Sequence, residues 1–205
     1  KIFNDSFFDL SYITDFDKEY LTSINLENFY EKNKEKYEKK TYLWQKDTEF
    51  RELNDAEVSC TLKHIEAIKL ASLQDENISL IVEDDVLNNF RYKRNIKKIL
   101  KNDDDWDLLF IGEGIGKGFI KNKVGKKTFR RKLYDVEHPA TNCAEAYFIK
   151  KQAANTIYNN IIPFHLISDW ELAYQISNLD LKVKWCLPSI FYQGSRSGKY
   201  KSELR

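Results

Sequence analysis

The stretch ISLIVEDD, residues 78–85, decides the fold class. Four of its first five residues are apolar, and three of these are β-branched, which is typical of a buried strand. The strand ends in Glu83, Asp84 and Asp85. Three adjacent carboxylates repel one another and add nothing to a core, so a strand that ends in them favours a site at its carboxyl end. In open α/β sheets, ligands bind beyond the carboxyl ends of the strands.

Strands and helices alternate on both sides of this stretch. Upstream, Asn54 and Glu57 have the spacing of a capping box that opens a helix, and apolar residues from Val58 to Ala71 recur at helical spacing. Downstream we expect helices near 90–100, 151–158 and 168–177, and strands over 106–111, 144–149 and within 183–193. Ser168 and Glu171 predict a second capping box. This alternation predicts a single α/β domain over residues 1–205 with a mostly parallel central sheet.

Composition limits the function classes. The chain has 205 residues, with 33 Lys plus Arg against 32 Asp plus Glu, so it lacks the positive excess of a dedicated nucleic-acid binder. Its apolar runs are far too short for a membrane span, so membrane contact is expected to be peripheral at most. Three widely spaced cysteines favour a reducing compartment, which indicates the cytoplasm, and no pair has zinc-knuckle spacing.

Several residues are candidates for metal binding or for catalysis. Hard divalent cations bind carboxylate oxygens, so the strand end at residues 83–85 is either a metal site or a polar loop. Asp169 lies at a predicted helix start, where the helix dipole would keep it ionised as a structural group or as a base. Glu57, Cys60 and His64 share a helix face, but Glu57 and His64 are about 10 Å apart along the axis, which disfavours a metal-binding trio.

A glycine-rich loop covers residues 112–118 (GEGIGKG). It lacks the spacing of a nucleoside-triphosphate-binding loop, and the segment after it does not have a helical pattern. A mobile substrate loop is the remaining functional interpretation.

Three segments together resemble glycosyltransferase family 25, which includes lipooligosaccharide and collagen galactosyltransferases. Residues 57–64 (EVSCTLKH) are similar to the Gly-Cys-x-x-Ser-His helix of the family, and residues 80–86 (LIVEDDV) are close to its Leu-Glu-Asp-Asp-Val strand end. From Ala144 to Asp169, a Tyr-x-Ile strand and an Ala-containing helix lead to a proline-flanked Asp. Order and spacing agree over roughly residues 53–195, whereas the first strand of the family is not recognisable in residues 1–20.

The resemblance implies a GT-A-like nucleotide-sugar-binding domain and an inverting transfer of a hexose, galactose or glucose, from a UDP-linked donor to a glycan or glycoprotein acceptor. It implies that Asp85 ligates Mn²⁺ or Mg²⁺ with help from Asp84. Glu83 or Asp84 would contact the ribose or sugar, and Asp169 would be the base. Arg196 and Lys199 would close over the diphosphate, or else belong to a basic tail.

Two other functions fit the same residues. A GT-A-like domain that binds a glycan or a protein without catalysis is favoured by the missing first strand and disfavoured by the intact acidic triplet. Another metal-dependent phosphate enzyme, such as a nucleotidyltransferase, would share the carboxylates but would need a triphosphate-binding segment that the sequence does not display.

Overall fold

A computed structural model describes residues 7–41, 48–88, 91–102, 105–113, 124–127, 133–136, 144–195 and 197–200. Its helices are the 3₁₀ turns η1 (Lys18–Ser23) and η2 (Leu26–Asn28) and the α-helices α1 (Lys34–Thr41), α2 (Asp55–Leu73), α3 (Tyr92–Asn102), α5 (Lys151–Ile161) and α6 (Ser168–Asn178). Its strands are β1 (Ile78–Val82), β2 (Val86–Asn88), β3 (Leu108–Phe110), β4 (Val124–Lys127), β5 (Leu133–Val136), β6 (Ala146–Lys150), β7 (Val183–Cys186) and β8 (Phe191–Gln193).

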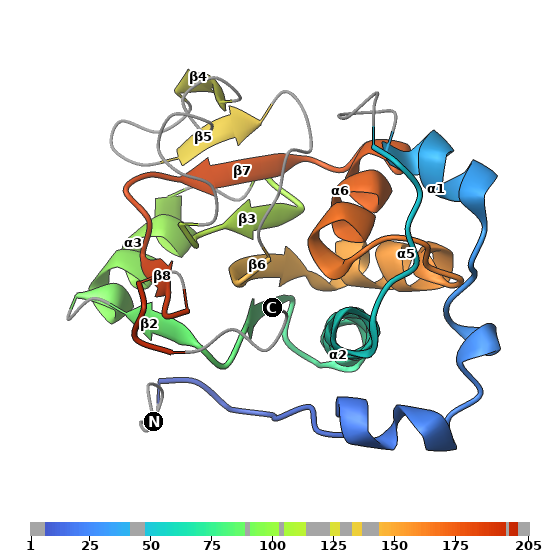
Figure 1. Cartoon of the computed structure of the whole chain (residues 1–205). Coiled ribbons are helices and arrows are strands. Elements are labelled where there is room, and N and C mark those ends of the chain that lie inside the picture. Colours follow the sequence, from blue (N-terminus) through green and yellow to red (C-terminus); the bar gives the residue numbers. More distant parts are fainter. Residues whose placement is uncertain are drawn as a thin grey trace.

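The main sheet has the strand order β1-β6-β3-β7-β5-β4, and it is mixed (Figure 1). Among the pairings of described strands, only β3 with β7 is parallel, so the prediction of a mostly parallel sheet is wrong. The α/β class with helices and strands in one domain is confirmed. The reason for the difference is β6, which enters between β1 and β3 and runs antiparallel to both. Alternation along the chain predicts which segments are strands, but it does not set their order or direction.

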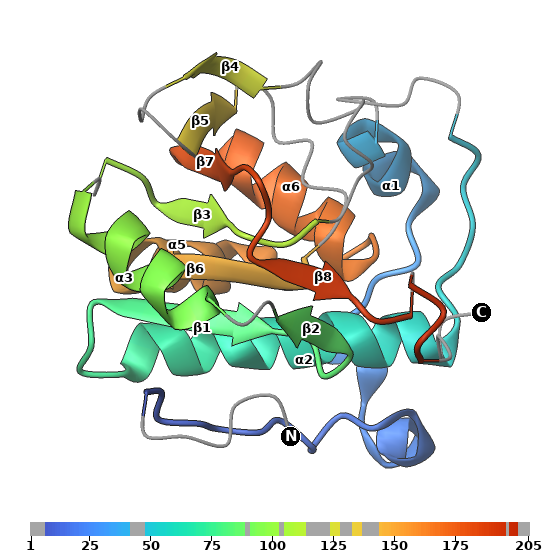
Figure 2. The same ribbon diagram turned by 90° about the vertical axis from the view of Figure 1, so that its left-hand side faces the viewer.

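Strands β1, β3 and β7 nevertheless point the same way. Both β1 and β3 are antiparallel to β6, and β7 is parallel to β3, so the carboxyl ends of all three lie at one edge of the sheet. At this edge the chain continues into a second, two-stranded sheet, in which β2 pairs with β8 in an antiparallel ladder (Figure 2). Backbone N–H groups of Ile190 and Phe191 donate to the carbonyl of Ile111, which joins the start of β8 to the end of β3.

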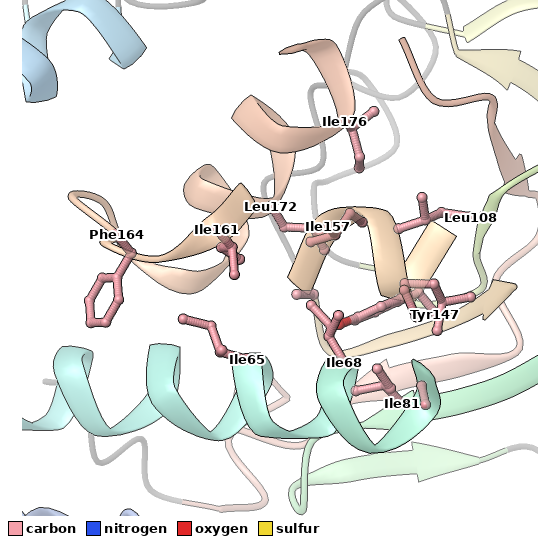
Figure 3. Packing of buried hydrophobic residues seen from close by; sticks show 14 of the residues in the cluster. Ile65, Ile68, Ile81, Leu108, Tyr147, Ile157, Ile161, Phe164, Leu172 and Ile176 are labelled. Carbon is pink, nitrogen blue, oxygen red and sulfur yellow. The ribbon is translucent and has the colours of Figure 1, made fainter. Parts of the chain in front are cut away.

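Helices cover both faces of the main sheet. Alternate residues of β6 point to opposite sides, as the pleat of a strand requires: Tyr147 and Ile149 join one buried cluster, and Ala146 and Phe148 join the other. The first cluster lies under α2, α5 and α6, and Figure 3 shows its α2 and α5 side chains meeting over the sheet. The second cluster lies under α3 and the β2–β8 sheet.

Helix α2 forms as predicted. The side chain of Asn54 accepts a hydrogen bond from the backbone N–H of Glu57, and Glu57 accepts one from the N–H of Asn54, which completes the capping box. The predicted apolar stripe, Val58, Leu62, Ile65, Ile68 and Ala71, is buried throughout. Strand β1 also has the predicted bounds, but it is an edge strand in which only Ile81 is buried, and the other four residues are partly exposed. Among the helices of the described residues, none combines the length and apolar character that a membrane crossing requires.

The second predicted capping box is wrong. Helix α6 begins at Ser168, one residue after Ile167 as N-cap, and no described side chain caps it. Glu171 is fully buried, and its side chain reaches back to the segment just before the helix. One of its oxygens accepts from the backbone N–H groups of His165 and Leu166, and the other binds Lys40 Nζ at 2.5 Å. Glu171 therefore binds Lys40 of α1 and the two backbone N–H groups before the N-cap, and not the backbone N–H of Ser168 that the spacing predicted.

Candidate functional site

A cavity of about 130 Å³ opens where the N-terminal half of α2, the carboxyl end of β1 and the start of α6 meet. Its walls include four carboxylates, a thiol and a hydroxyl, which belong to Glu57, Glu83, Glu145, Asp169, Cys60 and Ser168. Glu83 and Glu145 reach it together because the backbone N–H of Glu83 donates to the Glu145 carbonyl at 2.9 Å, which extends the β1–β6 pairing by one residue. The cavity is thus an acidic site at the edge where the strands end.

His64 lies next to this site, close to Cys60 and Glu83 of its wall. It is buried, with its Nε2 atom 3.4 Å from Glu83 Oε1 and its Nδ1 atom 3.5 Å from the hydroxyl of Tyr147. The His64 and Tyr147 rings are stacked, with centroids 6.2 Å apart. Burial works to lower the pKa of His64, but interactions with Cys60, Glu83 and Tyr147 outweigh it and raise this pKa well above its usual value. The surroundings of His64 therefore favour a positive charge.

Glu57 lines the cavity but does not belong to the group that Cys60, His64 and Glu83 form. Its carboxylate forms a two-pronged ion pair with Arg51, with N–O distances of 2.6 and 2.7 Å, and also caps α2. The hydrogen bonds from Arg51 lower the pKa of Glu57. Glu57 therefore does not form a trio with Cys60 and His64, as its spacing on the helix predicts, and another carboxylate joins these two instead. That carboxylate is Glu83, which comes from a different element and has no helical spacing to reveal it.

Asp169 lies in the first turn of α6, as predicted, but its ionisation differs from the expectation. Asp169 is partly exposed to solvent at the cavity wall, and protein surrounds its carboxyl group on the other sides. This burial raises the pKa of Asp169 to about 7, with a further upward contribution from the charge of Glu83. The hydrogen bond from the backbone N–H of Trp170 to Oδ1, at 2.9 Å, works in the opposite direction but is weaker. The predicted effect of the helix dipole is thus overridden by desolvation.

Asp84 and Asp85 point elsewhere. Asp84 is exposed. Asp85 Oδ2 accepts a hydrogen bond from the backbone N–H of Ser195 at 2.9 Å, and the Asp85 carbonyl accepts one from Gly194. Asp85 Oδ1 is buried and has no hydrogen-bond partner among the described residues. Asp85 therefore holds the turn after β8 through Oδ2, and its Oδ1 atom is buried without a partner among the described residues.

The same turn brings Lys199 toward the acidic strand end. The backbone N–H of Lys199 donates to the carbonyl of Gly194 at 3.0 Å, and its side chain is exposed. Arg196, predicted with Lys199 to close over a diphosphate, lies outside the described residues, as does the glycine-rich loop after Glu113. Within the described part of that loop, Gly112 touches the site: a Cβ atom there would come within 2.4 Å of Glu145 Oε1.

Sequence reasoning missed Glu145. It is 1% exposed and lies directly before β6, within the apolar run AEAYFI at residues 144–149. A single acid inside an otherwise apolar run has no role in a core, and that was the available signal.

The turn that Asp85 holds leaves no room for a side chain at Gly194. A Cβ atom at this position would lie 2.4 Å from the Asp85 carbonyl oxygen and 2.4 Å from the ring of Tyr200. We expect Gly194→Ala to lower the free energy of unfolding by about 1–3 kcal/mol in urea denaturation, because a backbone oxygen cannot move aside cheaply. Gly198→Ala is the control: it has open space around it and a φ of +75°, so only backbone strain of about 1 kcal/mol is expected. Equal, small losses for both variants would contradict the close contact.

Comparison with known proteins gives no assignment: neither the protein-family models nor the curated proteins match this chain.

Proposed function

We propose that this chain is a metal-dependent inverting glycosyltransferase of the GT-A type. It would transfer a hexose, galactose or glucose, from a UDP-linked donor to a hydroxyl of a glycan or protein-linked acceptor. The observation that carries the proposal is that Asp169, with a pKa of about 7, shares one cavity with Glu83 of the acidic strand end. A base that is poised near neutral pH is what abstraction of a hydroxyl proton needs.

The acidic strand end fits a divalent cation. Asp85 Oδ1 is a buried carboxylate oxygen without a described partner, and the exposed carboxylate of Asp84 is its neighbour in sequence. Hard cations such as Mn²⁺ and Mg²⁺ bind oxygen ligands of this kind, so Asp85 and Asp84 would hold the ion. When bound, the cation would offset the negative charge of the nucleotide diphosphate as it leaves.

The protein's own groups would perform the remaining tasks. A carboxylate oxygen of Asp169 would accept the proton of the acceptor hydroxyl as that oxygen attacks the sugar. Glu83 would contact the ribose or the sugar, since it lines the same cavity. Lys199, on the turn that Asp85 anchors, would add positive charge beside the diphosphate together with Arg196.

A donor screen tests the proposal. The full chain is incubated with Mn²⁺ and each common nucleotide sugar in turn, with a mixture of glycan acceptors, and release of nucleotide is measured. We expect release from one UDP-linked hexose, and none after removal of the metal with a chelator. Manganese-dependent protection by UDP in thermal melting without any turnover would favour the non-catalytic binding domain instead. Turnover of a nucleoside triphosphate would favour a nucleotidyltransferase.

The Asp85→Ala variant tests the metal assignment. We expect it to abolish manganese-dependent binding of UDP, measured by calorimetry, because the oxygen assigned to the cation is removed. It should also lower the free energy of unfolding by about 1.5–3 kcal/mol, since the Ser195 N–H loses a charged acceptor.

Asp105→Ala is the matched control for this variant. Asp105 is an exposed acid whose ion-pair partner is Lys182, at the opposite end of the strands, so neither binding nor stability should change appreciably. Unaltered binding of Mn²⁺ and UDP by Asp85→Ala would refute the assignment.

A further inference from the structure

A thiol, an imidazole and a carboxylate converge beside the cavity. Cys60 and His64 are one helical turn apart on α2, and Glu83 follows β1. One ligand atom from each of the three lies within 4.8 Å of the other two. The trio therefore presents sulfur, nitrogen and oxygen donors to one point, from two elements that are held together by the sheet and the helix layer.

The donor set and its charge define the kind of ligand. Sulfur and nitrogen ligands with one carboxylate suit Zn²⁺, whereas Mn²⁺ and Mg²⁺ favour all-oxygen sites. Thiolate and carboxylate together carry two negative charges, which one divalent cation neutralises.

We propose that Cys60 Sγ, His64 Nε2 and Glu83 Oε1 form a binding site for a single Zn²⁺ ion. The proposal concerns metal binding alone and does not depend on the proposed glycosyltransferase activity.

The geometry needs little adjustment. Ligand atoms around tetrahedral zinc are about 3.5 Å apart, given bond lengths of about 2.0–2.3 Å. The 3.4 Å between His64 Nε2 and Glu83 Oε1 already matches this separation. No two ligand atoms of the trio are more than 4.8 Å apart, so side-chain movements of about 1 Å would complete the set.

The surroundings of the trio are also suited to a metal. The hydroxyl of Tyr147 lies 3.5 Å from His64 Nδ1, which orients the ring so that Nε2 faces Glu83. Such a contact to the second ring nitrogen is usual for a metal-binding histidine. Cys60 and Glu83 both line the cavity, together with Ser168 and Asp169. The fourth position on the ion would therefore face the cavity, which is the arrangement of a zinc ion that can also bind a small ligand.

The test uses the full chain after treatment with a chelator, without nucleotide. Zinc affinity is measured by competition with a chromogenic chelator, and Co²⁺ is used as a spectroscopic substitute. We expect one Zn²⁺ per chain and, with Co²⁺, an intense near-ultraviolet charge-transfer band that reports a thiolate ligand. Zinc should also protect Cys60 from alkylation by iodoacetamide, as located by mass spectrometry, and this readout needs no variant.

Variants then identify the ligands. Cys60→Ser, His64→Gln and Glu83→Gln are each expected to weaken zinc binding by at least about 100-fold, since loss of an outer partner alone costs about 10–100-fold. Cys60→Ser should remove the charge-transfer band.

Two controls match the trio. Cys186→Ala removes a buried thiol from the other buried cluster, and His165→Gln removes a histidine whose Nε2 atom lies 3.1 Å from Glu31 Oε2. Both should bind zinc as the parent does.

Two results would overturn the proposal. One is unchanged zinc affinity in Cys60→Ser, and the other is Co²⁺ binding without a charge-transfer band, which would place the metal on oxygen ligands such as Asp84 and Asp85. Failure of the glycosyltransferase proposal is separate: the donor screen would show no nucleotide release while the zinc site, tested without nucleotide, remained intact.

Discussion

Replacement of Asp169 by asparagine is expected to reduce turnover by about 10²–10⁴-fold, the usual cost of losing a positioned general base. Asparagine has nearly the same shape, and its side-chain oxygen can still accept the hydrogen bond from Trp170 N–H. Manganese and UDP affinities should be retained, because neither is assigned to this side chain. The measurement is steady-state transfer with the donor that the screen identifies.

The parent protein should show the matching pH dependence. Because the pKa of Asp169 is raised to about 7, the carboxyl is mostly protonated below that pH and cannot accept a proton. Turnover should therefore rise as the pH increases through about 7 and then level off. A profile that levels off near the ordinary pKa of an aspartate, or near-normal turnover by Asp169→Asn, would exclude Asp169 as the base.

The free energy of unfolding of the parent protein should fall as the pH rises, whereas its turnover should increase. The pKa of Asp169 is 3.8 in the unfolded chain and about 7 in the folded one, so the folded state holds the proton more tightly. The stability from this group is complete below about pH 4 and is lost as the pH rises through 7. Asp169→Asn removes that loss, so at about pH 8 we expect it to be more stable than the parent by about 1–4 kcal/mol. The upper figure takes the full shift, and the lower allows for water in the cavity.

Ser168→Ala is the control for both measurements. It changes the adjacent wall of the same cavity, where Ser168 Oγ lies 3.6 Å from Cys60 Sγ, but it leaves the Asp169 carboxyl in place. It should keep the pH profile of the parent. A gain in stability at high pH that appeared equally in Ser168→Ala would show that the effect does not come from the buried carboxyl.

Glu171→Ala is expected to lower the free energy of unfolding by about 3–5 kcal/mol, because it removes the carboxylate that pairs with the buried ammonium of Lys40. The Lys40 and Glu171 side chains are 9% and 0% exposed, and they lie 2.5 Å apart. Burial lowers the pKa of Lys40, although the charge of Glu171 and its hydrogen bond work to raise it. The carboxylate also accepts from the backbone N–H groups of His165 and Leu166, so its loss would release the segment that leads into α6.

Lys32→Ala is the matched control for the buried pair. Lys32 and Glu52 form an ion pair of similar length, 2.8 Å, but both side chains are 58% exposed. Its loss should change stability by less than about 1 kcal/mol in the same urea titration. A loss of similar size for Lys32→Ala and Glu171→Ala would mean that burial does not strengthen the Lys40–Glu171 pair.

Local patterns in the sequence were sufficient for much of the secondary structure. The capping box at Asn54 and the stripe from Val58 to Ala71 predict α2 because both depend on residues within a few positions of one another. The β-branched run at 78–82 predicts β1 for the same reason. The acidic triplet that follows β1 was also correctly placed at the edge of the sheet where strands end.

The order of the strands and the contents of the site depend on contacts between distant segments. Nothing local to β6 reveals that it inserts between β1 and β3, so the direction of the sheet was predicted incorrectly. The same long-range pairing decides which of the three acids faces the cavity: Glu83 does, beside His64, while Asp85 binds the turn after β8. Burial, which is a property of the whole fold, then decides the ionisation of Asp169 and the true partner of Glu171. The charge of a side chain and its hydrogen-bonding groups are properties of the residue itself. The burial of that side chain and its contacts with distant residues are set only when the chain has folded.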